Sequence, residues 1–65
     1  MSDDADLARA LSTVDGYIAD SLHGLLTNAQ ALEEHPQDRH AGARVQSYLV
    51  LLDRLYAVRR GILDR

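Results

Sequence analysis

Residues 45–63, VQSYLVLLDRLYAVRRGIL, bring Val, Leu, Ile and Tyr side chains together at close spacing. Wound as an α-helix, at about 100° per residue, these side chains cover roughly half of the circumference. One neighbouring helix covers a stripe only a little over ~100° wide. The rest of the chain provides a single helix of comparable length. We therefore expect part of this apolar surface to be covered by a second protein molecule.

The apolar residues of this stretch are expected to form two adjacent stripes. One stripe has alternating steps of three and four residues: Tyr48, Leu51, Leu55, Val58 and Ile62. The other runs beside it: Val45, Leu49, Leu52, Tyr56 and Leu63. Arg59 falls inside the same arc, where its stem can cover apolar surface while its guanidinium reaches water, or it can make a polar contact at an interface. One stripe is expected to face the first helix and the other a second molecule.

Residues 3–34 are predicted to form the first helix. Apolar side chains recur there at steps of three or four: Leu7, Leu11, Val14, Ile18, Leu22, Leu25, Ala29 and Leu32. Beside this stripe a second line recurs every seven residues: Ala10, Tyr17, Gly24 and Ala31. Apart from Tyr17 these are small residues, which allow another helix to approach closely.

Pro36 separates the two helices. Proline inside a helix removes a backbone hydrogen bond and disfavours helical geometry at the residue before it, here His35. We therefore predict a turn over residues 35–40 and a second helix over about 41–63. A short connection between two helices makes an antiparallel hairpin. The whole chain, 1–65, is predicted to be one all-α domain: a two-helix hairpin that pairs with a second copy in a four-helix bundle.

A turn centred near Pro36 places Tyr48 level with Gly24, a large ring opposite a missing side chain. The same register brings opposite charges together at the chain ends: Asp3, Asp4 and Asp6 with Arg59, Arg60 and Arg65. Exposed ion pairs contribute only ~0–1 kcal/mol each, so these would select the orientation rather than hold the fold.

Length and composition also favour self-association. At 65 residues a single core rarely supplies more than ~3–5 kcal/mol, and without cysteine the chain has no disulfide or thiolate metal site. Oligomerisation is the remaining source of stability. The acidic N-terminus lacks the apolar region of a signal peptide, and the longest apolar run, residues 48–52, is far short of the ~20 residues that span a bilayer. We expect a cytoplasmic protein with no membrane contact.

No arrangement of residues predicts catalysis, a cofactor or a metal. His35 and His40 flank the turn around Asp38, but their spacing matches no established ligand motif, so a polar turn is the preferred interpretation. The helical serines have no histidine at a spacing that would supply a base, and the glycines are too scattered for a phosphate loop. The protein is therefore predicted to be non-enzymatic.

The expected function is that of a regulatory module that forms a homodimer and binds a partner protein. The residues expected in its core and interface are Tyr17, Leu25, Val45, Tyr48, Leu49, Leu52, Leu55, Tyr56, Arg59 and Ile62. A net charge of −3 argues against nucleic acid as the partner, although arginines gather near the C-terminus.

Two alternatives follow from resemblances in length and hairpin architecture. The chain resembles the Rop-type RNA-binding regulators, which dimerise into four-helix bundles, and this implies a small dimeric RNA-binding regulator. It is also similar to the small hairpin co-chaperones of type III secretion systems, which implies a heteromeric hairpin covered by a larger partner. Lysine is absent and arginine takes its place, which indicates a GC-rich coding sequence. We also expect a bacterial or phage origin.

Overall fold

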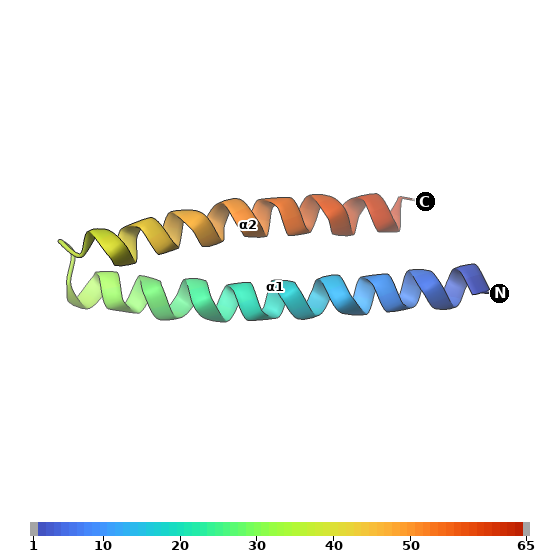
Figure 1. Cartoon of the computed structure of the whole chain (residues 1–65), viewed down its shortest axis with the longest axis horizontal. Coiled ribbons are helices and arrows are strands. Elements are labelled where there is room, and N and C mark those ends of the chain that lie inside the picture. Colours follow the sequence, from blue (N-terminus) through green and yellow to red (C-terminus); the bar gives the residue numbers. More distant parts are fainter. Residues whose placement is uncertain (1, 65) are drawn as a thin grey trace.

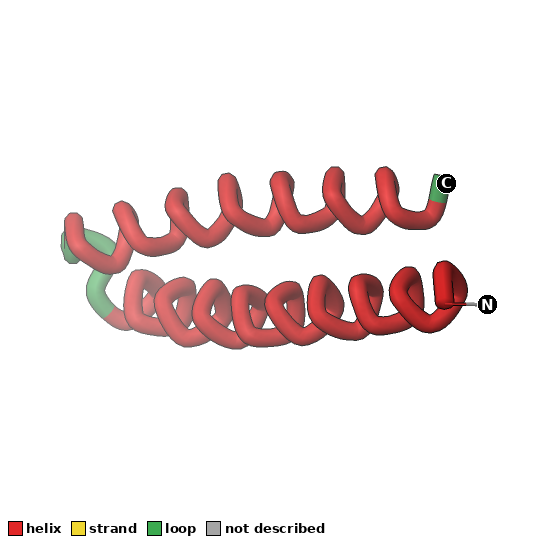
Figure 2. The backbone as a smooth tube through the Cα atoms, turned by 45° about the vertical axis from the view of Figure 1, so that its right-hand side comes forward, coloured by secondary structure: helices red, strands yellow, loops and turns green. Residues whose placement is uncertain are grey.

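The computed structural model describes residues 2–64, which form two α-helices packed against each other. Helix α1 spans Ser2–Glu34 and helix α2 spans Arg39–Leu63. The helices run in opposite directions, so the start of α1 and the end of α2 lie at the same end of the molecule (Figure 1). At that end α1 extends beyond α2, and one short connection closes the other end (Figure 2). The predicted all-α antiparallel hairpin is confirmed.

The turn is closed by backbone hydrogen bonds and by one side-chain cap. The Asp38 N–H donates to the carbonyl of His35 at 3.0 Å, which closes a four-residue turn around Pro36. The Asp38 carboxylate then accepts from the N–H groups of His40 and Ala41 at 2.9 and 3.1 Å. These bonds satisfy donors that the first turn of a helix leaves without partners, so α2 begins directly after Asp38, at Arg39.

Each helix has one stripe that is shielded from water. On α2 the shielded residues alternate between steps of four and three: Ala41, Val45, Tyr48, Leu52, Leu55, Arg59 and Ile62. On α1 the same alternation occurs: Leu7, Leu11, Val14, Ile18, Ser21, Leu25, Asn28 and Leu32. We refer to these two sets together as the inner stripe. Its seven-residue repeat is that of two helices packed as a coiled coil.

The inner stripe corrects the predicted apolar stripes. On α2 it combines members of both predicted stripes and leaves Leu51 and Val58 exposed. On α1 it contains Ser21, only 5% exposed, in place of Leu22, which is 45% exposed. Asn28 likewise replaces Ala29. The prediction chose the more apolar of two adjacent residues at each of these steps. In the structure, the residue that is shielded is the one whose position on the helix faces the opposite helix.

The core is small. Val14, Ile18 and Leu52 form its centre, and no described large side chain is buried completely. Partly buried residues pack around this centre: Leu25, Leu55 and Ile62. Two helices cannot surround a side chain on all sides, so the core remains one layer thick.

The predicted register between Gly24 and Tyr48 is confirmed. A Cβ at Gly24 would overlap with the Tyr48 ring, with Cε1 at only 2.7 Å. The missing side chain therefore leaves the space that the ring occupies. Because each helix rises by the same amount per residue, this one contact aligns the rest of the pair.

Replacing Gly24 by Ala tests this contact. A Gly→Ala change in a helix normally stabilises it by about 0.5–1 kcal/mol, and Gly16→Ala should do so because nothing lies within 4 Å of its added Cβ. Gly24→Ala should instead displace the Tyr48 ring and leave the protein at least about 1 kcal/mol less stable than Gly16→Ala. Urea unfolding followed by circular dichroism measures both. Equal stabilisation by the two substitutions would contradict the contact.

Candidate functional site

Large apolar side chains lie exposed along both edges of the inner stripe. On the first edge, Tyr17 lies on α1 seven residues before Gly24, and Leu51 and Val58 follow Arg44 on α2 at intervals of seven. Seven residues are close to two helical turns. Tyr17 therefore lies on the same edge of α1 as Gly24, and Leu51 and Val58 lie on the same edge of α2 as Arg44. Gly24 contacts Tyr48 on α2, and Arg44 donates a hydrogen bond to Asn28 on α1. The edge of α1 with Gly24 and the edge of α2 with Arg44 therefore lie on the same side of the hairpin. We call this edge, with Tyr17, Leu51 and Val58, the tyrosine flank.

The opposite edge carries more apolar side chains. Leu49, Tyr56 and Leu63 recur every seven residues on α2, on the other side of its inner stripe. On α1, Leu22 is seven residues after Asp15, and Leu26 lies one turn further. We call this edge the leucine flank: Leu22, Leu26, Leu49, Tyr56 and Leu63. All five side chains are exposed to solvent.

The residues expected in the core and interface divide between the inner stripe and the two flanks. Seven lie on the inner stripe, where they are buried or half-buried: Leu25, Val45, Tyr48, Leu52, Leu55, Arg59 and Ile62. The other three are exposed, Tyr17 on the tyrosine flank and Leu49 and Tyr56 on the leucine flank. Leu26 was not anticipated. Its spacing of four from Leu22 is the signal that would have included it.

Arg59 reaches across the hairpin to α1. Its Nε donates to Oδ1 of Asp15 at 2.8 Å, and the two side chains are 40% and 51% exposed. At this exposure the pair contributes ~0–1 kcal/mol at most. The stem of Arg59 occupies a position on the inner stripe, so the residue serves both as a cover for apolar surface and as a polar link between the helices.

The predicted pairing of Arg59 with the acidic N-terminus is wrong. The register set by Tyr48 places Asp15 level with Arg59, because α1 extends beyond the end of α2 (Figure 1). Asp6 instead lies 3.7 Å from Arg9 on its own helix. Arg65, another predicted partner, lies outside the described residues.

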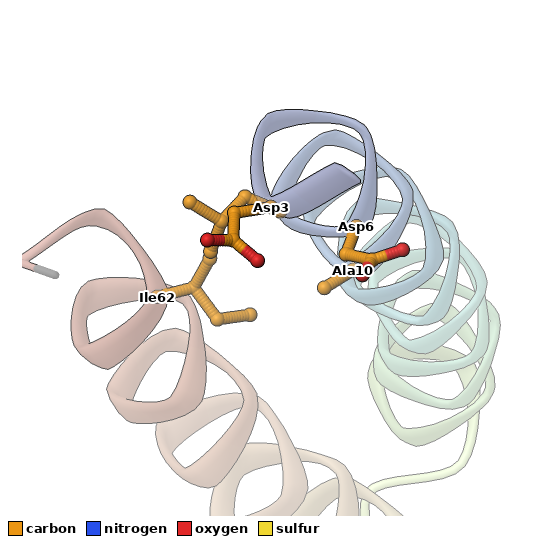
Figure 3. A pocket seen from close by; sticks show the side chains of 5 residues that line it. Asp3, Asp6, Ala10 and Ile62 are labelled. Carbon is orange, nitrogen blue, oxygen red and sulfur yellow. The ribbon is translucent and has the colours of Figure 1, made fainter. Parts of the chain in front are cut away.

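A shallow recess lies at the open end of the hairpin. It is lined by Asp3, Asp6, Leu7, Ala10 and Ile62. Figure 3 shows Asp3 beside Ile62, with Asp6 and Ala10 further along α1. The recess lies where the inner stripe ends, at Leu7 and Ile62, and the carboxylates of Asp3 and Asp6 stand beside this apolar surface.

The turn is polar and its chemistry is that of a helix cap. Hydrogen bonding by the Ala41 N–H lowers the pKa of the Asp38 carboxyl below its ordinary value of 3.8. Partial loss of water opposes this shift, while the His40 N–H and the charge of Arg44 add to it. Within residues 2–64, no three His, Asp or Glu side chains gather closely enough to hold a metal ion. Over the same residues, no helix has the length and apolarity needed to cross a membrane.

Comparisons with known proteins identify no relative from which a function could be transferred. No protein-family model, no curated protein and no solved structure matches the chain. The exposed flanks and the inner stripe are therefore the features from which a function is argued.

The cap predicts a specific pH dependence. Because the folded-state pKa of Asp38 is lowered, the stabilisation from its ionised form is fully present above the unfolded pKa and is lost as the pH falls through the folded pKa. Asp38→Asn keeps a side-chain acceptor but has no charge. The wild type should be more stable than Asp38→Asn at pH 7, and this difference should vanish well below pH 3.8 in urea unfolding. A difference that does not change with pH would contradict the assignment.

Proposed function

We propose that this protein is a non-enzymatic interaction module, which dimerises through one flank into a four-helix bundle and binds a partner protein through the rest of its surface. The exposure of eight large apolar side chains along the two flanks of the described hairpin carries the proposal. Contiguous exposed apolar surface on a small protein typically marks an interaction site.

The amount of exposed surface supports self-association. The chain exposes 5161 Å², whereas a globular monomer of its 7.2 kDa mass exposes about 4,100 Å². The excess of roughly 1,000 Å² compares with the ~800 Å² that each subunit contributes to an interface of standard size. A second copy of the hairpin would bring the exposed surface per chain to an ordinary value.

The shape supports the same proposal. The hairpin measures 52 × 15 × 12 Å, with a radius of gyration of 15.1 Å, against about 11 Å for a compact domain of this length. A second hairpin laid along the first enlarges a short dimension and leaves the long one unchanged. It also adds a second layer of side chains to a core that is one layer thick. Four-helix bundles place such a core between facing helices.

The partner protein is proposed to bind the flank that the dimer leaves open. Each flank combines apolar or tyrosine side chains with a neighbouring arginine, a composition enriched at protein interfaces. A regulatory role would follow if the partner engages only the assembled dimer. Nucleic acid is not favoured as the partner. Arg59, the arginine of the inner stripe near the C-terminal end, is neutralised by Asp15.

Size-exclusion chromatography with light scattering tests self-association. At micromolar concentrations the wild type should elute as a species of about 14 kDa, twice the chain mass, with the helical circular dichroism of a folded bundle. Loading over a hundredfold concentration range controls for weak association.

A folded, stable monomer across this range would contradict the proposal. An aggregated species without a defined melting transition would also contradict self-association. It would favour a heteromeric hairpin that needs a larger partner.

A further inference from the structure

We infer that the second copy docks on the leucine flank, not on the tyrosine flank; this assignment rests on the proposed self-association. Both helices contribute to the leucine flank, with Leu22 and Leu26 from α1 and Leu49, Tyr56 and Leu63 from α2. On the tyrosine flank α1 contributes one large side chain, Tyr17, followed at intervals of seven by Gly24 and Ala31. A four-helix bundle needs apolar side chains from both helices of each hairpin, and the leucine flank supplies them.

The residues on either side of the two α1 leucines strengthen this difference. Ala19 precedes Leu22 and Ala29 follows Leu26 on the same edge of α1, so this edge of the leucine flank is apolar from residue 19 to residue 29. Small residues beside large ones leave room for side chains of a second helix. On the α1 edge of the tyrosine flank, the space at Gly24 is already filled by the Tyr48 ring.

The charged groups on the two flanks favour the same choice. On the tyrosine flank, Arg44 Nε donates to the neutral amide oxygen of Asn28, whose Nδ2 donates in turn to the carbonyl of Gly24 at 2.7 Å. Burying this guanidinium beneath a second hairpin would remove it from water with no carboxylate bonded to it. Beside the leucine flank, Arg59 of the inner stripe donates to Asp15 at 2.8 Å. A second hairpin there would bury part of a pair that is already neutral.

The Asp15–Arg59 pair also gives the leucine flank a polar element. A buried polar pair stabilises an interface less than apolar contacts do, but it disfavours registers that separate its two charges. A leucine-rich surface alone would pair in several registers. The tyrosine flank, left open in the dimer, then remains for the partner protein.

Two leucines of one helix provide a matched test. Leu49 on the leucine flank is 47% exposed, and Leu51 on the tyrosine flank is 42% exposed. They have the same side chain, lie two residues apart and are both in the middle of α2, which spans Arg39–Leu63. Leu49→Glu should raise the dimer dissociation constant by about 100-fold or more, and Leu51→Glu should change it by no more than ~3-fold. Analytical ultracentrifugation of both variants measures these constants.

Thiol labelling provides a second readout that does not require the dimer to be broken. The chain has no cysteine, so Leu49→Cys and Leu51→Cys each introduce a single thiol. Above the dissociation constant, the thiol at position 49 should react at least ~10-fold more slowly than the thiol at position 51, because the interface covers it. Below the dissociation constant the two rates should become similar.

The outcomes separate this inference from the proposed function. A wild type that is monomeric at all concentrations contradicts both. A dimeric wild type in which Leu51→Glu dissociates the dimer, or in which the thiol at position 51 is the protected one, overturns the choice of flank and leaves self-association standing. Equal effects of both leucines would also overturn the choice, because they would mean that both flanks are covered.

Discussion

Two helices that lie side by side can shield only one stripe of each other from water, and the rest of this structure depends on that constraint. The inner stripe is this shielded surface, and Val14, Ile18 and Leu52 form its centre. Apolar side chains outside this stripe have no place in the hairpin. Their exposure is therefore a consequence of geometry, and a larger assembly is the direct way to cover them.

Within the hairpin, the Tyr48 ring sets the alignment of the helices. It occupies the space that Gly24 leaves, and this contact brings Asn28 to Arg44 and Asp15 to Arg59. The two polar contacts lie on opposite sides of the inner stripe, one on each flank. The register therefore determines which flank carries a neutralised ion pair and which carries a guanidinium bonded to an amide. This difference links the packing of one chain to the choice of the proposed docking surface.

Much of the architecture could be predicted from the sequence because the signals are local. Pro36 marks the end of one helix, the apolar repeats mark both helices, and the pairing of Tyr48 with Gly24 follows from the position of the turn. The Asp38 cap is also a local signal, because an acidic residue just before a helix is a common N-cap.

The orientation of each helix could not be predicted in the same way. Adjacent residues such as Ser21 and Leu22 differ by 100° on the helix, and hydrophobicity favours Leu22. The structure instead buries Ser21 and exposes Leu22, because Ser21 is the residue that continues the alternating steps of the inner stripe. Arg59 illustrates the same limit, since its partner Asp15 lies on the other helix and is set by the register. Tyr17, Leu49 and Tyr56, which the sequence predicts at the core or interface, are exposed on the two flanks.

If the hairpin completes its core only with a second copy, folding and association are one process. The thermal unfolding midpoint, measured by circular dichroism at increasing protein concentration, tests this claim most directly. For folding coupled to dimerisation, the midpoint should rise by about 10 °C over a hundredfold increase in concentration. A reversible transition whose midpoint stays constant over that range would show that the single hairpin is the complete folded unit, and would contradict the account.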